Sequence, residues 1–368
     1  QHLGFGVTVN LSYESPYQFA RRFASLDHLT HGRIGWNIVT GYLDSAERLI
    51  GQKGLKDHDL RYEQAEEFLE LCYKFWEGSW EDDAVQKDKL NRVFTDPSKV
   101  HAIQHQGKFF QSQGVFQVSP SIQRTPVLYQ AGASSKGLAF ATQHAEAMFI
   151  GADTPEKLKQ QVDKIRALAL SHGRDEQAIK LFVGISVVTA ETDELAQEKL
   201  AEYIRYASPE AGLVHFSSSV GIDLAQFTDD EAIPYKQTNS IASVNNKFKE
   251  QKVTRADLKA QHVLGGRYPL IVGSGKTVAE KLIQLLDETG VDGFNLTRTV
   301  APESHQDFIR WVIPELQERG RYKTAYETGS LRHKLFAQGD RLAADHPVQQ
   351  YRCQSSSPDS KTQQKQTA

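Results

Sequence analysis

The fold is decided by the stretch Leu3-Gly-Phe-Gly-Val-Thr-Val-Asn-Leu-Ser-Tyr13, which is followed by a helical pattern over 16–30 and by Gly32-Arg-Ile-Gly-Trp-Asn-Ile-Val-Thr-Gly41. The first and last segments are apolar and β-branched, a composition typical of strands buried on both faces. Ser15 is placed to cap the helix between them. A strand-helix-strand unit of this length predicts two parallel strands joined by a right-handed crossover.

The composition indicates a globular protein and excludes several classes of partner. Hydrophobic residues make up 39% of the 368 residues and charged residues 24%, as in ordinary globular domains. The net charge is -3 and no basic run is sustained, which argues against nucleic acid or an anionic membrane as partner. No apolar run approaches the roughly 20 residues of a membrane span. Cys72 and Cys353 form no disulfide framework, so we expect a reducing, cytoplasmic location.

Strand and helix patterns alternate along the rest of the chain. Two segments, at about 79–121 and 208–264, interrupt this alternation and are predicted insertions. We therefore expect one barrel domain over 1–344, and a polar tail over 345–368 that is disordered because it has too few apolar residues to offset its ordering entropy. Strands are predicted at 126–131, 147–151, 180–190 and 292–297, and helices at 61–77, 134–144, 155–172, 193–206, 277–288 and 302–319.

Repeated strand-helix units form either an open doubly wound sheet or a (β/α)8 barrel. The pattern contains about six core strands, a number that suits an open sheet. Two insertions at strand ends are typical of barrel active sites. Because the chain begins almost directly on a core strand, we expect a (β/α)8 TIM barrel that lacks its first two β-α units.

Two motifs predict ligand contacts. Gly132-Ala-Ser-Ser-Lys-Gly137 follows a strand and opens a helix, where glycines, hydroxyls and free N–H groups suit a phosphate. The alternative is an ordinary capped turn. In Asp57-His-Asp-Leu-Arg-Tyr62, the histidine and tyrosine lie four residues apart and can share a helix face against a planar ligand. The alternative is a helix start with acidic capping residues.

Three other patterns are too incomplete to predict a site. Val272-Gly-Ser-Gly-Lys-Thr277 resembles the end of a P-loop, but Leu270 stands where that motif needs its first glycine. His101 and His105 have the spacing of metal ligands without a third ligand nearby, so we predict no metal. The glycine fingerprint of a dinucleotide-binding unit is absent from the sequence.

With these pieces together, the chain resembles the bacterial-luciferase-like flavin monooxygenases. It is most similar to the branch that contains nitrilotriacetate monooxygenase component A, long-chain alkane monooxygenase and dibenzothiophene-sulfone monooxygenase. The resemblance extends from Gln1 to about Arg352. It rests on 32–41 and on four further stretches, Arg21-Arg-Phe-Ala-Ser-Leu-Asp-His-Leu-Thr30, Tyr73-Lys-Phe-Trp-Glu-Gly-Ser-Trp-Glu-Asp-Asp83, Gln123-Arg-Thr-Pro-Val-Leu-Tyr-Gln-Ala-Gly132 and Val291-Asp-Gly-Phe-Asn-Leu296.

The resemblance implies a TIM barrel that uses reduced FMN as a cosubstrate. A separate flavin reductase would supply the FMN, and O2 would react through a peroxyflavin to oxygenate a small organic substrate of the sulfone, alkane or aminocarboxylate class. It implies a homo-oligomer and no metal. Two alternatives stay open, an inactive fragment of such an enzyme and a luciferase-like oxidoreductase that uses a deazaflavin.

The resemblance also assigns cofactor-binding positions, whereas it assigns no catalytic acid or base. Thr8 is expected beside the flavin ring, and the backbone of Gly41 stands where relatives often have serine. His58 and Tyr62 match a flavin-contacting pair. The phosphate end matches Ser134, with Ser135 nearby. These residues are Thr8, Gly41, His58, Tyr62, Ser134 and Ser135.

Overall fold

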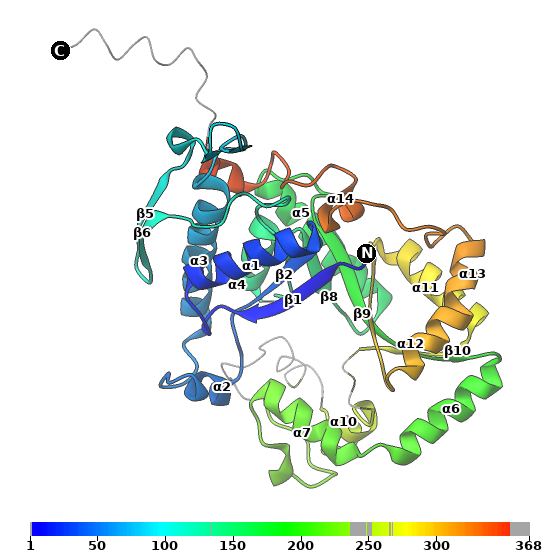
Figure 1. Cartoon of the computed structure of the whole chain (residues 1–368). Helices are drawn as coiled ribbons and strands as arrows, with labels where there is room; N and C mark the ends of the chain where they lie inside the picture. The colour runs from blue at the N-terminus through cyan, green and yellow to red at the C-terminus, as the bar shows by residue number, and fades with distance from the viewer. Residues whose placement is uncertain are drawn as a thin grey trace.

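A parallel β-sheet forms the centre of the computed structural model (Figure 1), which describes residues 2–353 except 133, 236–247, 249–251, 265 and 267. Within this part of the chain the sheet has seven strands in the order β1-β2-β7-β8-β9-β10, and β11 also pairs with β9. All of these pairings are parallel. The strands are β1 (Phe5–Asn10), β2 (Ile34–Val39), β7 (Val127–Gln130), β8 (Ala147–Ile150), β9 (Lys180–Ala190), β10 (Leu270–Ser274) and β11 (Gly293–Thr297).

Helices follow the strands along the chain and pack against the sheet, while α7 and α10 gather beyond one end of it (Figure 1). No helix in the described ranges is long and apolar enough to cross a membrane. The helices are α1 (Pro16–Thr30), α2 (Asp44–Leu49), α3 (His58–Gly78), α4 (Ser135–His144), α5 (Pro155–Ser171), α6 (Asp193–Tyr206), α7 (Pro209–Val220), α10 (Arg255–Gln261), α11 (Gly275–Thr289), α12 (Glu303–Asp307), α13 (Ile313–Glu318) and α14 (Leu331–Phe336).

The first strand-helix-strand unit forms as the sequence predicts, but the prediction that its first strand is buried on both faces is wrong: most of β1 is exposed, because within the described residues it pairs with β2 alone. The Ser15 side chain caps α1 by accepting a hydrogen bond from the backbone N–H of Gln18 at 3.4 Å. The left-handed residue that ends α1 is His31, with φ 52°, and Gly32 follows it with φ 78°. β1 and β2 then pair in register, so that Thr8 lies opposite Asn37.

The structure corrects the predicted number of core strands. β10 overlaps the stretch that resembles a P-loop, and it pairs with the last residues of β9. Gly273 interrupts its apolar pattern and Gly275 follows it directly as the first residue of α11, so the short strand has no clear sequence period. Ser274 then caps α11 through its side chain, so this stretch is a strand followed directly by a capped helix.

The two predicted insertions differ in structure. Between α3 and β7 the chain forms two antiparallel hairpins outside the central sheet, β3 (Val85–Asp88) with β4 (Val93–Thr95) and β5 (Ala102–Gln106) with β6 (Gln111–Val115). The described part of 208–264 contains α7, α10 and a 3₁₀ turn at Leu224–Gln226, packed around their own apolar cluster. The bounds of the barrel domain and its insertions stay a prediction.

The predicted last helix at 302–319 is interrupted. A π-helical segment, Phe308–Val312, separates α12 from α13 directly before Pro314. Proline has no N–H to donate, and its ring clashes with the carbonyl four residues earlier, so the turn before it widens.

The predicted disordered tail begins too early. Residues 345–353 are ordered, with a 3₁₀ helix at Pro347–Tyr351, and both His346 and Val348 are buried. The His346 ring lies 2.9 Å from the carbonyl oxygen of His144. The few apolar residues of this segment are enough because they enter a core already formed by α3 and α4. The remainder of the predicted tail lies outside the described residues.

The sheet has two ends in the described part of the chain. β1 pairs there with β2 alone, and the side chains of Phe5 and Val7 are exposed. That the chain lacks two further β-α units stays a prediction.

A buried ion pair joins the C-terminal segment to the sheet. Arg332 of α14 donates to both carboxylate oxygens of Glu146, at 2.6 and 2.9 Å, and also to the carbonyl oxygen of Thr125 at 3.0 Å. Both charged side chains are at most 5% exposed. Because Glu146 also accepts from the backbone N–H of Leu128 at the start of β7, this pair fixes α14 against two strands.

Substituting Arg332→Met is expected to lower the free energy of unfolding by about 3–5 kcal/mol, since it leaves a buried carboxylate without its cation. Denaturant unfolding measures the effect. Lys159→Gln, which removes an exposed pair with Asp163, is the matched control and should change stability by less than about 1 kcal/mol. Equal losses in the two variants would contradict the role given to Arg332.

Candidate active site

Polar side chains gather where β1, β2 and β7 end. The carboxyl ends of parallel strands meet at one edge of a sheet, and ligands of barrel enzymes bind there. Two helices begin at this edge, α3 at His58 and α4 at Ser135.

The structure brings together three of the predicted residues. The Nε2 atom of His58 lies 3.2 Å from the Oγ atom of Ser134. The rings of His58 and Tyr62 are 5.1 Å apart between centroids and tilted by 55°. α3 begins at the histidine, three residues before the predicted start at 61, so the pair shares a helix face, which is directed at the beginning of α4.

Tyr62 is a buried phenol at the centre of this group. Its side chain is 8% exposed and forms hydrogen bonds with the side chains of Gln130, Ser134 and Thr40. Burial raises the pKa of Tyr62, and these hydrogen bonds offset the rise only in part. The phenol therefore stays protonated at neutral pH and keeps a proton to donate.

The chain at the start of α4 packs so closely that Gly132 and Gly137 have no room for a side chain; this close approach is called the glycine cradle below. A Cβ atom at Gly132 would lie 2.8 Å from the Cα atom of Gly137, and one at Gly137 would lie 2.6 Å from the Tyr62 hydroxyl. Ser134 caps α4 by accepting from the Gly137 N–H at 3.0 Å. The exposed Ser135 is the first helical residue. The N–H groups at such a helix start have no partner within the helix and favour an anion.

The loop after β2 is fixed by a second polar group. The Arg61 guanidinium donates to the carbonyl oxygen of Gly41, and the buried Glu47 carboxylate accepts from the Ser12 hydroxyl at 2.5 Å. Gly41 has φ 79°, and a Cβ atom there would lie 2.7 Å from Asn10 Nδ2. This conformation favours glycine, so a serine side chain would not fit without movement of Asn10.

Thr8 lies apart from the His58 group and pairs instead with β2. Its Oγ1 atom accepts a hydrogen bond from Asn37 Nδ2 at 3.0 Å. Trp36 and Ile38 belong to the core beneath α1 and α3, so Asn37 projects from the opposite face of the sheet. Among the described residues, the buried Asn37 Oδ1 atom has no hydrogen-bond donor. A ligand with an N–H group would supply one.

Sequence reasoning missed several residues of this edge. Gln130 is 3% exposed and accepts from the backbone N–H of Gly132 while it contacts Tyr62. The available signal was a single polar residue at the end of an otherwise apolar strand. Asn37 carried a similar signal. Arg61 and Glu47 carried none, because charged residues near a helix start are ordinarily solvated.

Comparison with known proteins identifies the family. The family model of luciferase-like monooxygenases matches residues 1–293. The dimethyl-sulfide monooxygenase of Hyphomicrobium sulfonivorans is 45% identical, over 96% of this chain and 74% of that protein. The long-chain alkane monooxygenase of Geobacillus thermodenitrificans is 46% identical, over 96% of this chain and 77% of that protein.

A solved structure agrees with the sequence comparisons. A riboflavin lyase crystallised with modified FMN and riboflavin superposes with a TM-score of 0.90 at 40% identity, over 96% of this chain and 79% of that one.

The chain belongs to the luciferase-like monooxygenase family. The predicted family, the TIM-barrel fold class and the class of activity, an FMN-dependent monooxygenase, are confirmed. The assignment of individual residues to the cofactor stays a prediction.

The glycine cradle yields a direct test. Gly132→Ala forces the loop away from α4, so we expect the dissociation constant for FMN to rise about tenfold or more. Fluorescence titration measures it. Gly151→Ala is the matched control at the end of β8, where no atom lies within 4 Å of the added Cβ, and its affinity should be unchanged. Unchanged affinity in Gly132→Ala would show that the cradle does not hold the cofactor.

Proposed function

We propose that this chain binds reduced FMN where β1, β2 and β7 end, and uses it with O2 to place one oxygen atom on a small organic substrate. The observation that carries the proposal is the contact of His58 and Tyr62 with Ser134 at the start of α4. These groups and the helix terminus together form a set of donors suited to a phosphate monoester.

The phosphate end of the cofactor would lie at the start of α4. Ser134 and Ser135 carry hydroxyls there, and His58 adds a ring N–H whenever its tautomer or charge state presents one. The positive end of the helix dipole stabilises the phosphate charge. Tyr62 holds Ser134 in position, because its buried side chain contacts both Ser134 and Gln130.

The ring end would lie over the inner face of β1 and β2. Thr8 and Asn37 face that side, and the Asn37 Oδ1 atom is an acceptor for the kind of N–H group that a flavin ring carries. The loop at Gly41 adds backbone polar groups held in place by Arg61. When bound, reduced FMN supplies the electrons that activate O2.

Three aromatic side chains form an apolar surface on the face of the sheet that would hold the flavin ring. Tyr129 and Phe149 stack with ring centroids 5.7 Å apart, and Phe182 packs against Phe149 at 6.4 Å with its ring tilted by 39°. Apolar rings at this position would help to exclude water from the reaction.

We propose that a separate flavin reductase delivers the reduced FMN. The relatives named above act on dimethyl sulfide and on long-chain alkanes, and a substrate of the sulfide, alkane, sulfone or aminocarboxylate class fits this range. The same resemblance supports assembly of copies of this chain into a homo-oligomer.

His58→Ala and Ser134→Ala are each expected to weaken FMN binding by about 1–3 kcal/mol, because each removes a polar partner at a partly buried site. Anaerobic titration with reduced FMN measures the change. His172→Ala, at an exposed position after α5, serves as the control and should bind as the unmodified chain does. Wild-type affinity in both test variants would remove these residues from the site.

Turnover tests the reaction itself. The chain is mixed with FMN, NADH, a flavin reductase and a panel of sulfides, sulfones, alkanes and aminocarboxylates under ¹⁸O2. We expect one product to gain a single ¹⁸O atom, with none from labelled water. NADH consumption that yields hydrogen peroxide for every panel member, while FMN binds normally, would contradict the proposed oxygenation of these classes.

A further inference from the structure

Two pockets lie beside the proposed flavin site, and neither contains a residue assigned to the cofactor. The first, here called the inner pocket, has a volume of about 720 Å³. Thr297 at the carboxyl end of β11, Ser186 within β9 and Leu270 at the start of β10 line it, and the last two residues pair with each other in the sheet. Tyr42 also lines it and directly follows Gly41, which places the pocket next to the flavin loop.

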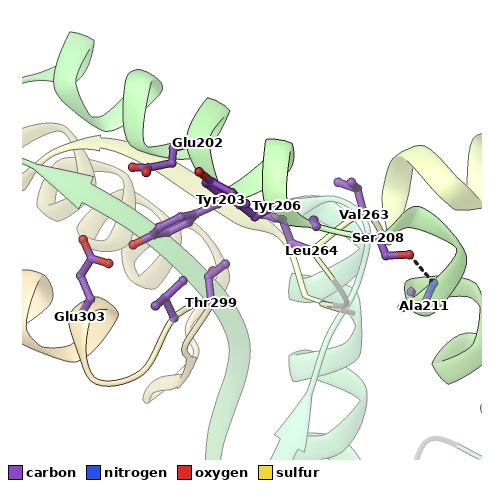
Figure 2. Close-up of a pocket in the computed structure, with 12 residues that line it drawn as sticks. Glu202, Tyr203, Tyr206, Ser208, Ala211, Val263, Leu264, Thr299 and Glu303 are labelled. Carbon is purple, nitrogen blue, oxygen red and sulfur yellow. Dashed lines mark hydrogen bonds between the residues drawn. The ribbon is translucent and has the colours of Figure 1, made fainter.

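The second, the outer pocket, has a volume of about 550 Å³ and lies between α6 and the segment before α12 (Figure 2). Val263, Leu264 and Thr299 line both pockets, so the two adjoin. Figure 2 shows that the outer pocket carries the carboxylates of Glu202 and Glu303 on either side of Tyr203.

The walls of the inner pocket combine apolar and polar side chains. Leu200 and Ile204 of α6 line it together with Leu264 and Leu270, and polar groups come from residues such as His215 and Gln261. The hydroxyls of Ser186 and Thr297 lie 2.6 Å apart and bond to each other. Thr297 also bonds to the carbonyl oxygen of Ile185 at 3.0 Å, so these two hydroxyls are already satisfied. Small-molecule sites of roughly 300–1,000 Å³ combine apolar walls with polar groups that orient the ligand.

Within the described residues, no carboxylate lines the inner pocket, and its one arginine or lysine is Arg298, an exposed residue at the pocket wall. In the same part of the chain, Arg298 forms no ion pair or hydrogen bond, whereas the Glu303 carboxylate of the outer pocket is paired with Lys199 at 3.1 Å. An anion is therefore attracted to Arg298 and repelled by the acidic outer pocket.

We propose that the inner pocket binds an elongated, mainly apolar organic acid, with its carboxylate or sulfonate at Arg298 and its apolar body along Leu200, Ile204 and Leu270. The guanidinium matches both anions because it can donate two parallel hydrogen bonds. The proposal deepens the proposed function and rests on it, because the organic acid is the substrate only if the neighbouring site holds the flavin.

The test measures binding to the flavin-free chain by calorimetry, so that it does not depend on turnover. The probes are decanoate, decane-1-sulfonate and decan-1-ol. We expect both anions to bind at least about tenfold more tightly than the alcohol. Comparing the affinities for decanoate and decane-1-sulfonate shows which of the two anionic head groups the pocket prefers. Equal affinity for all three would overturn the proposal.

Variants locate the binding. Arg298→Gln should remove the preference for the anions and leave the affinity for decan-1-ol within about twofold. Ile204→Glu, at a half-exposed position of α6 that tolerates a charge, should weaken both anions more than the alcohol. The control is Arg21→Gln on the exposed side of α1. Retention of the anion preference in Arg298→Gln would overturn the assignment.

The two proposals fail in different ways. If the anions bind through Arg298 while reduced FMN does not bind, the proposed function fails, and with it the identification of the organic acid as a substrate. If FMN binds and O2 is consumed while the Arg298→Gln variant oxygenates organic acids and neutral compounds as the unmodified chain does, only the inner-pocket proposal fails.

Discussion

The contact of three buried aromatic rings holds the site-bearing half of the molecule in place. Trp36 of β2 contacts Phe19 of α1 and Phe68 of α3, with ring centroids 4.2 and 6.0 Å away, and these two phenylalanines contact each other at 5.5 Å. All three side chains are at most 1% exposed. Such rings supply large buried areas and a preferred relative orientation. Because α3 is packed against this core, its first turns are held where His58 and Tyr62 reach Ser134, and the contacts of Tyr62 with Gln130 and of His58 with Asp59 support them there.

Buried polar groups near the amino ends of the strands are paired, whereas some polar groups near the carboxyl ends are not. Around Glu146 and Arg332, charged groups are buried and fully paired. Asp27 likewise accepts from both the backbone and the side chain of Gln123, at 2.9 and 2.6 Å. Near the carboxyl ends of the strands, the buried Asn37 Oδ1 atom has no hydrogen-bond donor among the described residues, and the exposed Arg298 forms no ion pair there. An unsatisfied buried acceptor costs about 1–3 kcal/mol, a cost that a bound ligand removes.

Local signals in the sequence predicted what local physics determines. Ser15, Thr154, Thr192 and Ser134 cap helices through their side chains, and helices form near the predicted positions. The four-residue spacing of His58 and Tyr62 correctly predicted a shared face. The sequence could not show features that depend on contacts between residues far apart along the chain.

The missed features depend on partners far along the chain. Gly273 hides β10, which is stabilised by its pairing with β9. Residues 345–353 are ordered by a core that other segments build. Arg332 reads as an ordinary surface residue until its contact with Glu146, 186 positions earlier, is known. In each of these cases, burial or strand formation is decided by tertiary contacts and not by the pattern of neighbouring residues in the sequence.

One helix, α3, connects the proposed flavin site with the loop beside the inner pocket. The first turns of α3 carry His58, Arg61 and Tyr62. Tyr62 is packed against the phosphate cradle, and Arg61 holds the carbonyl oxygen of Gly41. The next residue, Tyr42, lines the inner pocket. α3 therefore fixes the proposed flavin side and the loop that leads to the inner pocket, whereas the proposed contacts of the organic acid come from α6, from β10 and from the residue after β11. Oxygen transfer requires the reacting atoms to be held within about 3–3.5 Å of each other, so the two proposals together require that these elements keep a fixed relative position.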